Sequence, residues 1–273
     1  MAFIEAFEKS FGMIVKNPKV VLPATLRLMI ISFYLLYIFF FWKIFDSHTG
    51  LIERVKMFLL YEDKEALGSF GSLKLLLENY SSYIFVFLLG LFLISIIYLS
   101  FDAFLNLFYA FSMKQYYDRK KIYFDQSLDA SWKHLWKLFY TWMLAFIIIL
   151  LSLIANVLII FIPIVGIFAF FTFFFLILLF ALILFVLPSI VAFERKNGIE
   201  ALKGAANFVK ENFFSLFGVL IVFVVLQFIF LFSISSIPLF GYFAYLIIDV
   251  FFICWSKSLP AAFYLEVKSQ KSF

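Results

Sequence analysis

The sequence predicts an all-α integral membrane protein with six transmembrane helices, because of its composition, the length of its apolar runs and the placement of its charges. Hydrophobic residues make up 66% of the chain, and 44 of its 273 residues are Phe. A soluble domain is usually about 45–50% apolar. Charged residues make up only 14% of the chain, and most of them lie between the apolar runs. This excess of apolar surface indicates that lipid rather than water surrounds the protein.

Six apolar runs approach or exceed the roughly 20 residues that a helix needs to cross about 30 Å of hydrocarbon. Each should be helical, because irregular backbone is costly in lipid. The runs are 20–42, 80–101 with an extension toward 113, 138–161, 167–193, 213–236 and 239–265. The turns at 162–166 and 237–241 both have the sequence Ile-Pro-x-x-Gly. Proline ends a helix and glycine permits a tight turn, so each turn predicts a helical hairpin.

The distribution of Lys and Arg predicts that both termini are cytoplasmic. Six spans place the termini on one side, together with the basic connections around 114–137 and 195–210. The opposite side has only one charged connection, the 43–79 loop, where six acids offset five basic residues. Cytoplasmic loops carry the excess of Lys and Arg. The net charge of +5 is then explained by contact with anionic lipid. We expect the protein to reside in the cell membrane.

An internal repeat precedes the first, third and fifth runs. Ile4-Glu5-Ala6, Leu128-Asp129-Ala130 and Ile199-Glu200-Ala201 each place an acid and an alanine after an apolar residue. Each motif continues at steps of three and four, which is typical of an amphipathic helix in the membrane interface. Trp132 and Trp136 are the predicted interfacial anchors.

We therefore interpret residues 1–273 as one membrane domain of three units, each an interfacial amphipathic helix followed by a transmembrane hairpin. The units cover about 1–113, 114–194 and 195–267. The 43–79 loop is an insertion in the first unit. Apolar spacing over 67–77 predicts a short amphipathic helix within that loop.

Polar residues inside the apolar runs are the candidate functional site, because an intramembrane charge is costly and is a default functional hypothesis. Asp249 is the deepest, near the middle of the sixth run. In one interpretation Asp249 binds a proton or cation on a polar path, with Arg27 or Lys257 as its counter-charge. In the other, the same residues pair to hold helices together. The further polar positions are Asp102, Asn106, Asn156 and Gln227.

Enzyme, metal and cofactor signatures are missing from the sequence. The single cysteine, Cys254, lies in an apolar run, and His48 and His134 fall in different loops. A zinc site needs several such ligands at close spacing. The sequence contains neither a phosphate-binding glycine loop nor a Gly-x-Ser-x-Gly elbow. We expect no catalysis, no metal, no cofactor and no nucleic-acid partner.

A resemblance rests on Leu187-Pro188, on the segment Ile199 to Lys203 and on the Ile-Pro-x-x-Gly turn that follows. Over about 185–265 the chain resembles uncharacterised polytopic membrane families of archaea and bacteria. It is also similar to the membrane domain attached to some glycerophosphodiester phosphodiesterases. In those enzymes the catalytic residues lie in a separate soluble barrel, and this chain has no such barrel. The resemblance implies a membrane module without its own hydrolase.

These observations predict a non-enzymatic module that organises membrane lipids or a partner membrane protein. The alternative is a small transporter or channel whose polar path passes through Asp249.

Overall fold

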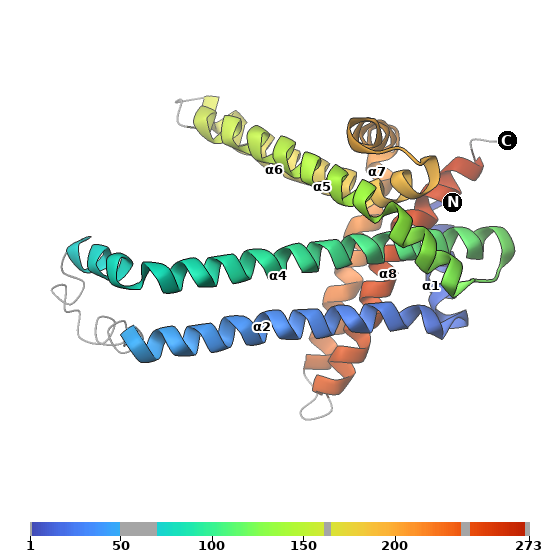
Figure 1. Ribbon diagram of the computed structural model, residues 1–273. Coiled ribbons are helices and arrows are strands. Elements are labelled where there is room, and N and C mark those ends of the chain that lie inside the picture. The colour runs from blue at the N-terminus through green and yellow to red at the C-terminus, as the bar shows by residue number, and fades with distance from the viewer. Residues whose placement is uncertain (1, 50–69, 161–164, 236–240, 271–273) are drawn as a thin grey trace. The chain divides into compact units, whose positions relative to one another are not determined.

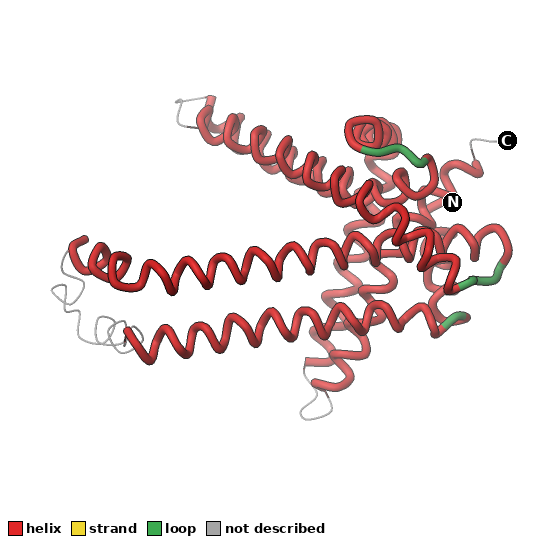
Figure 2. Tube along the Cα trace, viewed as in Figure 1, coloured by secondary structure: helices red, strands yellow, loops and turns green. Residues whose placement is uncertain are grey.

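The computed structural model describes residues 2–49, 70–160, 165–235 and 241–270, and this part of the chain is helical apart from short loops (Figures 1 and 2). Six of its helices are long and apolar enough to cross a membrane, which confirms the predicted all-α class and its six apolar helices. Most of the two Ile-Pro-x-x-Gly turns, and residues 50–69 of the outer loop, lie outside the described residues. In chain order the elements are α1 (Ala2–Lys16), the 3-10 helix η1 (Pro18–Val21), α2 (Leu22–Thr49), α4 (Phe70–Arg119), α5 (Phe124–Ile160), α6 (Val165–Glu194), α7 (Gly198–Ser235) and α8 (Gly241–Gln270).

Two helices differ from their predicted bounds. Residues 70–77, expected in a separate short helix of the outer loop, form the first turns of α4. The amphipathic segment that precedes the third apolar run was expected as its own helix, but α5 continues through both from Phe124 to Ile160. The physical reason is that α5 contains neither glycine nor proline, so nothing in its sequence interrupts the backbone hydrogen bonds.

The chain forms two compact units, one of Met1–Thr25 with Ser100–Phe273 and the other of Leu26–Leu99. In the larger unit, α1 packs on α8, α5 packs on α6 and α7, and α8 also contacts α6 and α7. Its core is built mainly from the C-terminal halves of α4, α6 and α8, and buried side chains of α1, α5 and α7 add to it. The largest fully buried side chains include Tyr109, Phe108, Tyr264 and Phe263.

An asparagine lies at the end of two amphipathic segments, α1 and the first part of α7. Asn17 separates α1 from η1, and its backbone is non-helical at φ −133°. Asn212 is non-helical at φ −125° and kinks α7. Each amide donates a hydrogen bond to the carbonyl oxygen four residues earlier, Asn17 Nδ2 to Met13 O at 3.0 Å and Asn212 Nδ2 to Phe208 O at 2.9 Å. These local bonds compete with the backbone ladder, which is why asparagine favours helix ends.

In the smaller unit, α2 and α4 approach each other closely at Gly90. The hydroxyl of Tyr37 on α2 lies 3.4 Å from the carbonyl oxygens of both Val86 and Phe87 on α4. The ring of Phe41 stacks on that of Phe87 at a centroid distance of 4.3 Å. Small residues at such contacts let membrane helices come close together.

Gly90→Ala should separate these two helices. A Cβ at Gly90 would overlap the hydroxyl and ring of Tyr37, and overpacking of this kind costs about 1–3 kcal/mol. The matched control is Gly218→Ala in α7, where a Cβ meets no described atom within 4 Å. Disulfide trapping of cysteine pairs introduced on α2 and α4 should weaken in Gly90→Ala and stay unchanged in Gly218→Ala. Equal trapping in both variants would contradict this contact.

Candidate functional site

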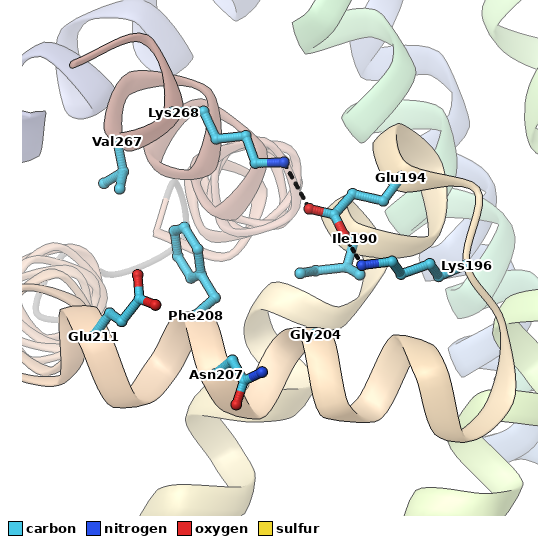
Figure 3. Close-up of a pocket in the computed structure, with 9 residues that line it drawn as sticks. All are labelled: Ile190, Glu194, Lys196, Gly204, Asn207, Phe208, Glu211, Val267 and Lys268. Atoms are coloured by element: carbon cyan, nitrogen blue, oxygen red, sulfur yellow. Dashed lines mark hydrogen bonds and ion pairs between the residues drawn. The ribbon is translucent and has the colours of Figure 1, made fainter. Parts of the chain in front are cut away.

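A polar pocket of about 230 Å³ lies between the end of α6, the start of α7 and the end of α8 (Figure 3). Its charged and amide side chains are Glu194 on α6, Lys196 in the α6–α7 loop, Asn207 and Glu211 on α7, and Lys268 on α8. Two acids and two lysines line this pocket in the part of the chain that the structure describes, and their formal charges balance. The site is outside the set of residues that the sequence suggested.

Glu194 is the centre of the pocket because three donors reach its carboxylate. Lys268 Nζ lies 2.6 Å from Oε1 and Lys196 Nζ lies 2.7 Å from Oε2 (Figure 3). The hydroxyl of Tyr264, which is fully buried, donates to Oε1 as well. The hydrogen bond from Lys196 to Glu194 and the charge of that carboxylate raise the pKa of Lys196 above its ordinary value.

The local sequence positions this carboxylate. Glu194 is the last residue of α6, and Arg195 then turns the chain with a positive φ of 57°. Gly198 begins α7 at φ 55°, a conformation that glycine adopts without strain. Its N–H donates to Thr141 Oγ1 of α5 at 2.9 Å. The α6–α7 loop is therefore fixed to α5 at one end and to α8 through Glu194.

This arrangement connects the α6–α7 loop to α8, because the Glu194 carboxylate accepts bonds from Tyr264, Lys268 and Lys196. Charge-assisted bonds of this kind are about twice as strong as neutral ones. We therefore interpret the Glu194 network as the connection that holds the loop and the C-terminal helix together.

A second polar cluster joins α4 to α8 and includes three of the predicted site residues. Lys257 Nζ lies 2.6 Å from Asp102 Oδ2, and the two side chains are only 15% and 14% exposed. Asn106 Nδ2 donates to the same carboxylate oxygen at 3.1 Å and to the carbonyl oxygen of Asp102 at 2.7 Å. Lys257, one of the two counter-charges that the sequence analysis considered for Asp249, thus bonds Asp102.

The other predicted polar residues lie elsewhere. Arg27 on α2 donates to the Tyr98 hydroxyl of α4 at 2.6 Å, within the smaller unit. Asp249 is half-buried in α8, and Gln227 is half-buried in α7. Asn156 lies in α5.

The N-terminal helix is held on α8 by a third polar cluster. Lys9 bonds the carboxylate of Glu266, which is only 2% exposed. Trp255 Nε1 donates to Ser10 Oγ at 2.9 Å, and the rings of Phe7 and Trp255 meet edge to face at 5.4 Å. The buried Tyr109 hydroxyl of α4 donates to the Val20 carbonyl oxygen and lies 3.0 Å from the Cys254 sulfur of α8.

The predicted interfacial anchors are exposed on one stripe of α5. Trp132 is 67% and Trp136 is 71% exposed, and Leu128 and Tyr140 continue the stripe at four-residue steps. Lys133 and Lys137 alternate with the two tryptophans along the chain. A stripe of this composition is typical of a helix surface at the boundary between headgroups and acyl chains.

Glu194 and Glu266 were missed, although the sequence contains a signal for them. Leu187-Pro188 precedes Glu194 and Leu259-Pro260 precedes Glu266, and in both the acid is the sixth residue after the proline. A lysine follows two residues after each acid. The repeated pattern marks both helix ends, but the apolar-run analysis considered only charges inside the runs.

The fold and these clusters define a helical multi-pass membrane protein: six helices in the described residues have the length and composition of membrane spans. Within the same residues there is no group of three or more His, Cys, Asp or Glu side chains placed to hold a metal ion. No protein-family model matches the chain. No curated protein and no solved structure matches it either.

Proposed function

We propose that this chain is a non-enzymatic module of the cell membrane that organises phospholipids of the cytoplasmic leaflet. The observation that carries the proposal is the α5 stripe, where Trp132 and Trp136 are about two thirds exposed and lie beside Lys137 and the Lys133–Asp129 pair. Aromatic rings favour the headgroup level, and lysines near an anionic surface contribute about 1 kcal/mol each. The resemblance to membrane domains without hydrolase residues of their own agrees with this proposal.

The proposed topology has six spans, with both termini cytoplasmic, built from three units that each begin with an interfacial amphipathic segment. The positive-inside rule supports the orientation. The first and third units match over their buried side chains, Ala6, Ser10, Met13 and Ile14 in α1 and Ala201, Ala205, Phe208 and Val209 in α7. Every pair is 195 positions apart, as are Asn17 and Asn212. Units that repeat in one orientation are related by an axis along the membrane normal.

The second unit fits the same pattern in a shifted register. Ser131, Leu135 and Leu138 of α5 are buried at the spacing of Ala6, Ser10 and Met13. This register begins one residue after Ala130, the residue that the sequence motif had aligned with Ala6. Trp142 then falls at the position of Asn17 and Asn212, which explains why α5 lacks the asparagine break.

The rival function is transport through Asp249, and flux in proteoliposomes distinguishes the two. Wild type and Asp249→Asn are reconstituted in phosphatidylcholine and phosphatidylglycerol vesicles, and solute and proton flux are measured. We expect no flux in either protein, while the purified wild type retains phospholipid through detergent exchange. Flux that vanishes in Asp249→Asn would overturn the proposal in favour of a transporter.

A further inference from the structure

A second pocket, of about 250 Å³, lies between α5, α6 and α7 and is almost entirely apolar. Ala145 and Ile148 line it from α5, and Phe180 and Ile183 from α6. Ala145 and Ile183 are buried, whereas Ile148 is 41% exposed. The pocket therefore has a closed apolar floor and an apolar rim that is open to the surroundings.

The amphipathic start of α7 provides the remaining wall, and it adds one charge. Ile199, Leu202 and Ala206 present the apolar face of this segment to the pocket, and Lys203 lies beside them. Lys203 is exposed, and no salt bridge between described residues involves it. Lys203 is the only charged residue among the described ones that line this pocket.

We propose that this pocket binds one acyl chain of an anionic phospholipid, with the phosphate of that lipid held by the Lys203 ammonium. The lining suits a hydrocarbon chain, and a volume of about 250 Å³ falls just below the range of about 300–1,000 Å³ that whole small ligands occupy. The pocket is open at its rim, so part of one acyl chain can occupy it while the headgroup stays outside. The inference rests on the proposed function, because it assumes that the chain lies in a bilayer with the start of α7 in the interface.

The position of Lys203 favours an anionic lipid over a zwitterionic one. On α7, residues 199, 202, 203 and 206 recur at steps of three and four, so they share one face of the helix. Glu211 and Asn207 line the polar pocket on another face of α7. A lysine at the edge of an apolar face extends its stem along the hydrocarbon and keeps its ammonium at headgroup level.

Native mass spectrometry of the delipidated full chain tests this site, with dioleoyl phosphatidylglycerol and dioleoyl phosphatidylcholine as competing probes. Wild type should retain one phosphatidylglycerol in preference to phosphatidylcholine by about fivefold, the factor that corresponds to about 1 kcal/mol for one lysine near the surface. Lys203→Gln should bind both lipids equally. Ala206→Phe, which fills the pocket from an exposed position, should reduce the retention of both lipids at least fivefold.

The matched control is Lys210→Gln, which removes an exposed lysine of the same helix that lines neither pocket. It should keep the preference of the wild type. An unchanged preference in Lys203→Gln, or unchanged retention in folded Ala206→Phe, would overturn the site while leaving the proposed function intact. A wild type that retains no phospholipid at all would overturn both.

Discussion

Lys257→Met should destabilise the larger unit by about 3 kcal/mol, because it removes the cation from a carboxylate that is only 14% exposed. Breaking a buried ion pair from one side costs about 3–5 kcal/mol, since the remaining charge stays in a poorly solvated place. Asn106 still donates to Asp102, which places the expected cost at the lower end. Thermal unfolding in detergent, followed by circular dichroism, should show a clear decrease in the midpoint temperature.

Two variants make this result specific. Lys133→Met breaks the pair that Lys133 makes with Asp129 on α5, where the two side chains are 67% and 63% exposed. An exposed pair of this kind contributes about 0.3–0.5 kcal/mol, so the midpoint temperature should decrease much less. The double variant Asp102→Asn with Lys257→Met should recover part of the loss, because no charge is left without its partner. Equal midpoints for Lys257→Met and Lys133→Met would show that the α4–α8 pair is not buried.

Lys9→Met should release α1 from α8. The Glu266 carboxylate is 2% exposed, so losing its cation should cost about 3 kcal/mol. This corresponds to an increase of about a hundredfold in the population of the open helix. Hydrogen exchange of the α1 amides should accelerate by that factor, while the amides of α5 and α6 keep their protection. Lys16→Met, at an exposed position on the same helix, is the control and should leave exchange unchanged.

The same contact predicts how α1 responds to alkaline pH. Burial lowers the pKa of Lys9, but the hydrogen bond and charge of Glu266 outweigh burial and raise it above the ordinary value of 10.5. A raised pKa in the folded state means that the stabilisation is fully present below pH 10.5 and is lost as the pH rises through the raised value. Subtilisin cleavage of α1 should therefore increase only above that pH. In Lys9→Arg it should not increase, because arginine keeps its charge. Cleavage that rises at lower pH would contradict the ion pair.

Composition and run length predict the helices because both depend on local chemistry. Each apolar run is long enough to cross the bilayer, and a helix satisfies its backbone there without a neighbour. Helix ends are less predictable. The sequence placed a break before residue 138, yet α5 passes through it because no glycine or proline interrupts that stretch. At the fifth run the boundary expected before residue 213 coincides with the non-helical backbone of Asn212.

Partners between distant helices are the part that the sequence could not provide. Lys257 and Asp102 are 155 residues apart, and their pairing depends on how α4 packs against α8. The sequence analysis considered Lys257, as well as Arg27, as a counter-charge for Asp249, and it did not pair Lys257 with Asp102. Glu194 and Glu266 could have been found, since both follow a Leu-Pro pair at the same spacing and precede a lysine. Their partners, Lys268 and Lys9, again depend on tertiary packing.

We propose that both termini, and the start of α7 with the proposed lipid pocket, lie on the cytoplasmic side of the membrane. Labelling of single cysteines with an impermeant maleimide in sealed vesicles of known orientation tests this claim most directly. In a Cys254→Ala background, Glu8→Cys, Lys121→Cys, Asn197→Cys and Gln270→Cys use exposed positions, and Glu65→Cys lies in the 43–79 loop. We predict that the first four react from the cytoplasmic side and Glu65→Cys reacts only from the other. Reaction of Glu8→Cys and Gln270→Cys from opposite sides would contradict the six-span topology. It would also contradict the lipid site, which assumes that topology.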